Sequence, residues 1–135
     1  MSHQSLYLVR GLPGSGKSAL AKTIAGEFSY AADDFFYDLG QGSYAFDPSK
    51  LSDAHSLCQT RVETALKGGI RSVAVANTFT QSWEAEVYFK MADKYGYSVF
   101  IIECQNSFGN VHGVPPEAIE RMEARWEPKL RRPNG

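Results

Sequence analysis

The sequence predicts a three-layer α/β fold in which a mainly parallel sheet lies between helices on both faces. Three observations support this prediction. Short apolar runs alternate with longer amphipathic segments along the chain. A glycine-rich segment, residues 11–16, joins the first apolar run to the first amphipathic segment. The length of 135 residues suits one compact core, so residues 1–135 are expected to form a single domain.

The expected strands are the short apolar runs. The run at residues 70–76 is rich in valine and alanine, which is typical of a buried central strand in a parallel sheet. Because ligands of such folds bind beyond the carboxyl ends of the strands, we expect Asp33, Asn77 and residues 11–18 to converge there. Strands are expected at residues 5–10, 29–32, 70–76 and 97–103.

Capping residues indicate where the helices begin. Asp47, followed by a proline, is typical of an N-cap, and it comes after a loop rich in glycine and tyrosine. Thr80 or Ser82 is the expected N-cap of the third helix, and a Pro-Pro pair at 115–116 opens the last one. Helices are expected at residues 18–27, 48–67, 82–94 and 116–126, and residues 131–135 are expected to fray.

Two tryptophans are interpreted as core residues. Trp83 begins a series with Val87, Met91 and Tyr95 at four-residue spacing, which predicts one buried helix face. Trp126, near the end of the last helix, is expected to be buried in the same way.

Composition excludes several classes of protein. A net charge of −1 provides no overall field to hold a polyanion. Cys58 and Cys104 have no metal-ligand spacing and are expected to be reduced core residues. No apolar run approaches the roughly 20 residues that a membrane span needs, and the start of the chain lacks a signal-peptide pattern. We therefore expect a cytoplasmic protein without a membrane anchor.

The strongest motif is Gly-Leu-Pro-Gly-Ser-Gly-Lys-Ser at residues 11–18, a full match to the phosphate-binding P-loop between a strand and a helix. Its glycines let backbone N–H groups approach phosphate oxygens. Lys17 would bind the β- and γ-phosphates of a nucleoside triphosphate, and the Ser18 hydroxyl would be a ligand of Mg²⁺. The expected nucleotide-binding residues are Gly11, Pro13, Gly14, Ser15, Gly16, Lys17, Ser18 and Ala19.

A pair of acids, Asp33 and Asp34, follows the expected second strand. A carboxylate beside the transferred phosphate could accept the proton of a substrate hydroxyl. From position alone, a helix or turn cap is an equally good interpretation of either acid.

Four segments together resemble a known group of proteins. They are RGLPGSGKS at 10–18, ADDFF at 32–36, YAFDPSKLSDAH at 44–55 and NVHGVPPEAIERMEARWE at 110–127. They resemble the P-loop proteins related to bacteriophage polynucleotide kinase. This resemblance implies an ATP-dependent kinase fold in which Lys17 and Ser18 bind MgATP. It also implies that Asp33 is the general base toward a 5′-hydroxyl. We expect Asp33 to be, together with Ser18, a ligand of Mg²⁺.

The chain also departs from that group at three places. Phe35, Phe36 and Tyr37 stand where the group's polynucleotide kinases have a substrate-binding arginine. Ala76 stands where many members have a carboxylate at the end of the third strand. The lid that brings an arginine over the phosphates is shortened to about residues 106–110.

Arg121 or Arg125 could replace the missing lid arginine, and Arg125 is our catalytic candidate. The alternative is a solvated helix face, because glutamates surround both arginines and one of them lies four residues before Arg121. These glutamates are Glu117, Glu120, Glu123 and Glu127.

The remaining candidates have weaker patterns. His55 and His112 are expected to be structural, with His112 the better functional candidate. The aromatic cluster of residues 35–37, Tyr44 and Phe46 is expected to close the core, with stacking on a base as the minority interpretation. A nucleic acid acceptor would require a basic patch, for which Lys129, Arg131 and Arg132 are the candidates.

The sequence thus predicts a phosphotransferase that moves the ATP γ-phosphate to a hydroxyl on a nucleic-acid end or a small molecule. The alternative is an ATP-binding switch or partner module without kinase activity. A GTPase is disfavoured because no N-K-x-D motif is present.

Overall fold

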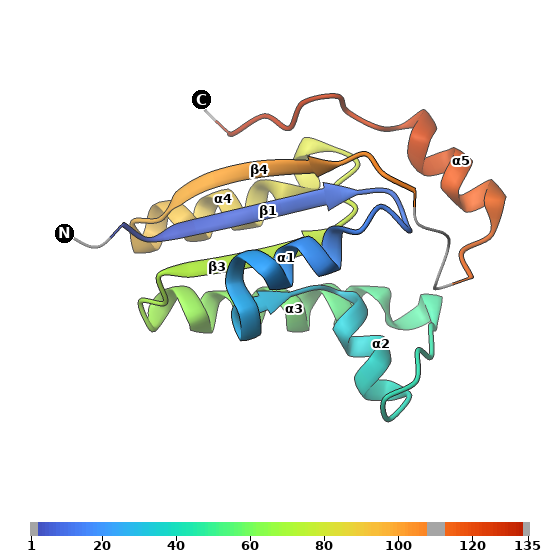
Figure 1. The fold of residues 1–135 in the computed structure, drawn as a ribbon, viewed down its shortest axis with the longest axis horizontal. Coiled ribbons are helices and arrows are strands. Elements are labelled where there is room, and N and C mark those ends of the chain that lie inside the picture. The colour runs from blue at the N-terminus through green and yellow to red at the C-terminus, as the bar shows by residue number, and fades with distance from the viewer. Residues whose placement is uncertain (1–2, 108–112, 134–135) are drawn as a thin grey trace.

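A computed structural model describes residues 3–107 and 113–133 of the chain. Its centre is a four-stranded sheet in which all strand pairs are parallel, in the order β2-β3-β1-β4 (Figure 1). The strands are β1 (Ser5–Gly11), β2 (Ser29–Tyr30), β3 (Ser72–Asn77) and β4 (Ser98–Cys104). The predicted parallel α/β fold is therefore confirmed.

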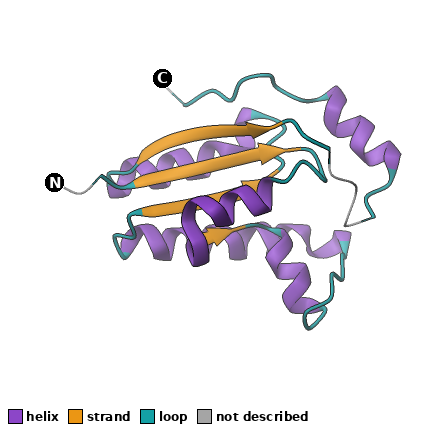
Figure 2. Cartoon of the chain, in the orientation of Figure 1, coloured by secondary structure: helices purple, strands orange, loops and turns teal. Residues whose placement is uncertain are grey.

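Helices cover both faces of the sheet, which makes the three layers visible in Figure 2. Helix α1 packs on one face, whereas α3 and α4 pack on the other. A short helix, α2, packs against α3, and α5 lies beyond the carboxyl ends of the strands (Figure 1). The helices are α1 (Lys17–Ala25), α2 (Asp33–Leu39), α3 (Leu51–Lys67), α4 (Ser82–Tyr95) and α5 (Pro116–Ala124), with 3₁₀ turns at Gly26–Phe28 and Pro48–Lys50.

The sheet order creates a ligand-binding edge between β1 and β3. Arg10 of β1 is in register with Asn77 of β3, so the two strands end side by side. The chain leaves β1 for α1 on one face and leaves β3 for α4 on the opposite face. Such a divergence is the topological switch point at which open α/β sheets bind ligands.

Alternate residues of the strands build two cores. Leu6, Leu8 and Val75 are fully buried against α3 and α4, whereas Val9 is fully buried under α1. The period of two residues in each strand explains this division. Because β3 is buried on both faces, its sequence is a continuous apolar run, as a central parallel strand requires.

Arg10 is a buried cation that joins the end of β1 to the C-terminal segment. It is 1% exposed, and its guanidinium donates hydrogen bonds to the carbonyl oxygens of Phe79 (2.7 Å) and Glu127 (2.8 Å). The same guanidinium lies 4.0 Å from the ring centre of Trp126 and 3.5 Å from a carboxylate oxygen of Glu103. Burial lowers the pKa of Arg10, and the charge of Glu103 opposes this shift.

Two predicted elements differ from the structure near β2. The strand ends at Tyr30 rather than at residue 32, and helix α2 starts at Asp33 where a loop was expected. The aromatic side chains of α2 favour a strand by propensity, but Phe36 is fully buried against Ala32 and Ala54. Tertiary packing therefore stabilises a helix that local sequence does not predict.

The predicted burial of Trp83 is wrong, since 70% of its side chain is exposed. Helix α4 buries Ala85, Tyr88, Phe89, Met91 and Ala92. Val87 and Tyr95 pack, partly buried, against the same core, so only Trp83 of the predicted series lies outside it. The N-cap is Gln81, not Thr80 or Ser82, and Gln81 forms a capping box with Glu84.

The C-terminal tail packs along α4 as far as Arg132, contrary to the fraying expected from residue 131, and residues 134–135 lie outside the described residues. Leu130 is buried, and the backbone N–H of Arg131 donates to the Ser82 hydroxyl over 2.8 Å. Arg132 pairs with Asp93 and lies over the ring of Phe89. Helix α5 ends at Ala124, so Trp126 lies beyond it, and the half-buried Trp126 ring stacks on Arg10. Across the described ranges, no helix combines the length and apolarity needed to cross a bilayer.

Candidate active site

The P-loop forms a tight turn between β1 and α1. Gly14 and Gly16 adopt left-handed backbone angles, with φ of 83° and 87°, which favour glycine. A Cβ atom on Gly11 would lie 2.2 Å from the Ser15 hydroxyl oxygen, so this position has no room for a side chain. Helix α1 begins at Lys17, directly after the turn, and directs its first N–H groups to the same edge.

The Ser15 hydroxyl supports anion binding at this turn. Ser15 is 3% exposed, and its oxygen makes no hydrogen bond within residues 3–107 and 113–133. A buried hydroxyl without a partner is unfavourable, and a phosphate oxygen at the loop would satisfy it. The residues present therefore fit a nucleotide phosphate.

Lys17 lies near the expected acid. Burial lowers the pKa of the Lys17 ammonium, while nearby Asp33 and Cys104 oppose the shift. Burial also raises the pKa of Cys104, which is half-buried rather than a core residue as expected. Both cysteines are free thiols, and Cys58 is in the core. Ser18 and Ala19, the next two residues of α1, are exposed.

Asp33 is the first residue of α2, at the carboxyl end of β2. Its Oδ1 atom accepts a hydrogen bond of 2.9 Å from the Tyr44 hydroxyl. Burial and the adjacent Asp33 carboxylate raise the pKa of Tyr44, so the hydroxyl stays protonated and donates. Sequence reasoning missed Tyr44 as a site residue and placed it only in the aromatic cluster.

Two side-chain caps hold the backbone that presents Asp33. The Asn77 Oδ1 atom accepts from the Ala32 N–H over 2.9 Å, and the Asp34 Oδ2 atom accepts from the Ala31 N–H over 3.0 Å. Asn77 therefore connects the end of β3 to the start of α2. Burial raises the pKa of Asp34, and its backbone hydrogen bond opposes the shift. Asp34 thus has the capping role that was one of two interpretations of this acid pair.

The aromatic cluster around α2 is mainly structural. Phe36 packs against Phe35, Tyr44 and Phe46, with ring centres 4.9 to 6.0 Å apart. This packing of the aromatic rings agrees with the expectation that the cluster closes a core. It also fixes the position of the Tyr44 ring, and hence of its hydroxyl beside Asp33.

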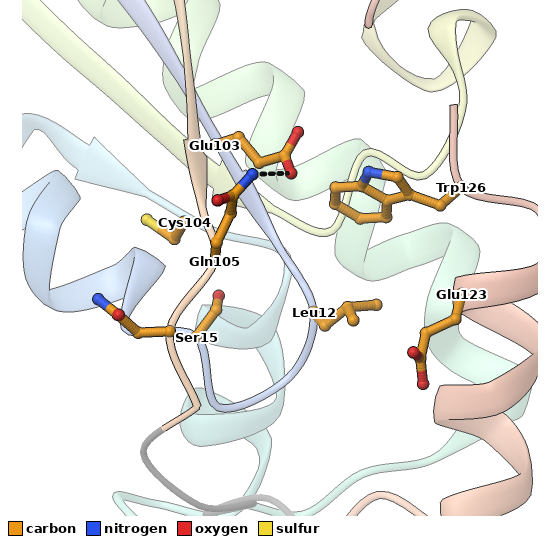
Figure 3. Close-up of a pocket in the computed structure, with 8 residues that line it drawn as sticks. Leu12, Ser15, Glu103, Cys104, Gln105, Glu123 and Trp126 are labelled. Carbon is orange, nitrogen blue, oxygen red and sulfur yellow. Dashed lines mark hydrogen bonds between the residues drawn. The ribbon is translucent and has the colours of Figure 1, made fainter. Parts of the chain in front are cut away.

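One cavity of about 290 Å³ lies beside the P-loop, and we name it the loop-side cavity. Figure 3 shows Ser15 of the loop pointing toward Gln105 at the end of β4, and Leu12 extending to the side of Trp126 and Glu123. Gln105 donates to Glu103 over 3.1 Å. The remaining lining residues are Glu103, Asn106 and Glu123.

A second cavity of about 620 Å³ lies between α3 and α4, and we name it the α3–α4 cavity. Arg125 lines it and donates from Nε to the Thr80 hydroxyl over 3.2 Å. Lys17 and Asp33 are not among its lining residues, so Arg125 borders a different cavity from the one beside the loop. The other residues are Leu51, Ser52, His55, Ser56, Gln59, Asn77, Phe79, Trp83, Glu84, Val87 and Tyr88.

The other sequence candidates are distributed around these cavities. His55 is half-buried in the α3–α4 cavity, and Arg121 is exposed on α5. Of the expected basic patch, Arg132 pairs with Asp93 and Lys129 is exposed. His112 and most of the expected lid, residues 108–112, lie outside the described residues.

The donor set is compatible with Mg²⁺ held together with a nucleotide. Within the described ranges, no group of three or more His, Cys, Asp or Glu side chains could hold a metal ion by itself. Magnesium commonly uses one or two protein oxygens together with phosphates and waters. Ser18 and Asp33, the ligands predicted from the sequence, supply a hydroxyl and a carboxylate oxygen of this kind.

Comparison with known proteins identifies the family. Residues 6–111, from β1 past the end of β4, match the AAA domain family. The chain belongs to this family. Its AAA domain has the P-loop nucleotide-binding fold, in the kinase-like form that the structural neighbours below share.

Two curated relatives share sequence with the AAA domain. The chain is 37% identical over 130 residues to human NEDD4-binding protein 2, a match that covers 87% of this chain and 7% of that protein. It is 31% identical over 107 residues to the 2′,3′-cyclic-nucleotide 3′-phosphodiesterase of Pongo abelii, a match that covers 74% of this chain and 24% of that protein. The chain thus spans less than a quarter of the length of both relatives.

Solved structures share the fold at lower identity. A candidate kinase from Chloroflexus aurantiacus superposes with a TM-score of 0.61 at 20% identity, covering 77% of this chain and 60% of that one. A chain of the Pnkp1/Rnl/Hen1 RNA repair complex gives a TM-score of 0.59 at 19% identity, covering 97% and 40%. These structures share the architecture of the AAA domain.

Proposed function

We propose that the protein is an ATP-dependent phosphotransferase of the polynucleotide-kinase-like branch, which transfers the γ-phosphate of ATP to a hydroxyl. The observation that supports this most is that the Asp33 carboxylate accepts a 2.9 Å hydrogen bond from the Tyr44 hydroxyl and interacts electrostatically with the P-loop ammonium of Lys17. A switch protein needs the loop, whereas a kinase also needs a base beside it.

In this proposal the P-loop binds the phosphates. Backbone N–H groups of residues 14–19 and the Lys17 ammonium hold the β- and γ-phosphate oxygens, and the Ser15 hydroxyl gains its missing partner. Ser18 and Asp33 would hold Mg²⁺, which when bound would neutralise charge on the phosphates. The free thiols agree with a cytoplasmic location, which is part of the proposal.

Asp33 acts as the general base. The acceptor oxygen forms a bond to the γ-phosphorus, the bond from that phosphorus to the bridging oxygen breaks, and its electron pair stays on ADP. The acceptor proton moves to the Asp33 carboxylate, which Tyr44 orients through their 2.9 Å hydrogen bond. Arg125 is our candidate for the cation that stabilises charge in the transition state.

The acceptor class is also proposed. The resemblance to polynucleotide kinases favours a 5′-hydroxyl of a nucleic acid. The names of two similar proteins, a cyclic-nucleotide phosphodiesterase and an RNA repair complex, agree with nucleotide chemistry. A small hydroxyl compound is the other candidate acceptor.

The second candidate function is an ATP-binding switch or partner module. Two arginines near the site already make other hydrogen bonds, which favours this function. Arg10 donates to the carbonyl oxygens of Phe79 and Glu127, and Arg125 donates to the Thr80 hydroxyl. A kinase would have to redirect Arg125 or use another cation. A switch would bind ATP and produce little ADP.

Label transfer separates the two functions. The protein is incubated with γ-labelled ATP, Mg²⁺ and a panel of 5′-hydroxyl DNA, RNA and nucleosides, with Lys17→Ala as the inactive control. The kinase proposal predicts a labelled acceptor with the parent and none with the variant. ATP binding without labelled acceptor or ADP would support the switch instead.

A further inference from the structure

The α3–α4 cavity has the position of an acceptor site. Its floor includes Asn77, which is 8% exposed and whose Oδ1 atom holds the N–H of Ala32, next to Asp33. Asn77 is also in register with Arg10, directly before the P-loop. A molecule in this cavity would thus lie at the carboxyl end of β3, beside the amide that holds the residue preceding Asp33.

The rim of the cavity presents an aromatic surface. Trp83 is 70% exposed, although tryptophan is normally mostly buried. Its indole N–H donates to the Gln81 side chain over 2.9 Å, which fixes the ring, and Gln81 itself is held by the capping box. An ordered, exposed indole is suited to stacking on a planar ring.

The polar groups of the cavity suit a neutral ligand. One wall of α3 presents Ser52, His55, Ser56 and Gln59, which together supply hydroxyl, imidazole and amide donors and acceptors. Glu84 is engaged by Thr80 and Gln81, so its carboxylate is already satisfied. Arg125 is the only lysine or arginine among the described lining residues.

We infer that the α3–α4 cavity binds the acceptor as a single neutral nucleoside, with its base on Trp83 and its hydroxyl end toward the Asn77 floor. This inference rests on the proposed kinase function. The volume of about 620 Å³ lies within the range of roughly 300–1,000 Å³ that small-molecule sites occupy. With one arginine, the cavity lacks the cations that a run of phosphates would require.

The test is nucleoside binding without ATP. Calorimetry with adenosine, guanosine, cytidine and uridine is combined with quenching of tryptophan fluorescence. We expect saturable binding of at least one nucleoside, with an affinity that changes less than about twofold between low and moderate salt, because no phosphate is neutralised. Absence of binding by all four nucleosides at millimolar concentration overturns the inference.

Variants locate the site. Trp83→Ala should weaken nucleoside binding about tenfold or more, whereas Trp83→Phe, which retains a stacking ring, should restore most of the affinity. Phe100→Ala is the matched control, because Phe100 is an exposed aromatic (49%) on β4 that lies outside the cavity. Equal affinities of parent and Trp83→Ala would place the nucleoside elsewhere and overturn the inference.

Failure of the kinase proposal gives a different result. Lys17→Ala should lose ATP binding and keep nucleoside binding. If the parent protein binds nucleosides but transfers no phosphate to any acceptor, the nucleoside site is supported and the kinase proposal fails. Conversely, phosphate transfer to a non-nucleoside acceptor, with a KM that Trp83→Ala does not change, would support the kinase proposal and overturn the nucleoside site. A 5′-hydroxyl oligonucleotide that binds more tightly than its first nucleoside would show that phosphates contribute to binding, and would overturn the assignment of a single neutral nucleoside.

Discussion

At the scale of single residues, the candidate site depends on a few polar contacts in a half-buried setting. Tyr44 donates to Asp33, and Lys17 lies close to the same carboxylate. Both contacts have more effect there than at the surface, because burial reduces competition from water. The P-loop itself follows from a local motif, whereas Tyr44 reaches Asp33 only through the packing of Phe36 and Phe46.

Removing the Tyr44 hydroxyl should slow catalysis without weakening ATP binding. Tyr44→Phe keeps the ring in the aromatic cluster and loses a hydrogen bond to a charged group, typically about 1.5–3 kcal/mol. We expect kcat to fall roughly tenfold to a hundredfold. Tyr95→Phe is the control, because it removes a 3.0 Å tyrosine–carboxylate bond to Glu63 far from the site. An unchanged kcat in Tyr44→Phe would remove Tyr44 from the mechanism.

ATP affinity should fall as the pH rises. Burial holds the pKa of Lys17 below its ordinary value of 10.5, so the free protein loses this positive charge at a lower pH than an exposed lysine would. The loss proceeds as pH increases toward 10.5, and with it the attraction for phosphates. Calorimetry across the alkaline range measures the effect, and Lys17→Arg, which keeps its charge, should show much less of it. The same pH dependence in both proteins would refute this prediction.

At the scale of elements, Asn77 joins the end of β3 to the start of α2. Its side chain accepts from the Ala32 N–H and donates weakly toward the Cys58 sulfur at 3.9 Å. Two strands of the sheet therefore determine the position of Asp33 through one amide. Asn77 was expected at this edge, but its partner depends on the conformation of the turn after β2.

Asn77→Ala should destabilise the fold and displace Asp33. The Ala32 N–H would stay buried without an acceptor, which costs about 1–3 kcal/mol. Urea denaturation measures the free energy of unfolding, and Asn77→Asp, which keeps an acceptor oxygen at the same place, should lose less. A free energy of unfolding in Asn77→Ala equal to that of the parent would contradict this role.

Local patterns predict most elements but not all of them. Strands β1 and β4 lie within one residue of their predicted bounds, because buried apolar runs between turns have few alternatives. Helix α2 was missed because its aromatic residues favour strands and its stability comes from contact with α3. The face predicted for α4 is correct at Met91, Val87 and Tyr95 but wrong at Trp83, which lies in the first turn of the helix and is exposed.

At the scale of the whole molecule, the C-terminal segment is part of the fold. Arg10 at the end of β1 is bonded to the carbonyl oxygen of Glu127, and Leu130 enters the larger core. The segment also carries Trp126 across the loop-side cavity (Figure 3). The nucleotide edge of the sheet is thus connected to residues that lie far away in sequence.

Arg10→Met should release this segment. The substitution leaves carbonyl oxygens of Phe79 and Glu127 without their donor, and breaking such a buried charged network costs about 3–5 kcal/mol. We expect a lower free energy of unfolding in urea and faster tryptic cleavage at Lys129. Arg132→Ala, which loses only an exposed pair, is the control. Cleavage at the parent rate in Arg10→Met would show that the segment is held by other contacts.

The most direct test of the proposed phosphotransferase is the single-turnover rate of phosphate transfer by Asp33→Asn, with the acceptor found by labelling and saturating MgATP. Asp34→Asn is the matched control, because an amide oxygen can still cap the Ala31 N–H. The proposal predicts a loss of about a hundredfold or more for Asp33→Asn, since the base is removed, and a near-parent rate for Asp34→Asn. Transfer by Asp33→Asn at the parent rate would contradict the assignment of Asp33 as the base.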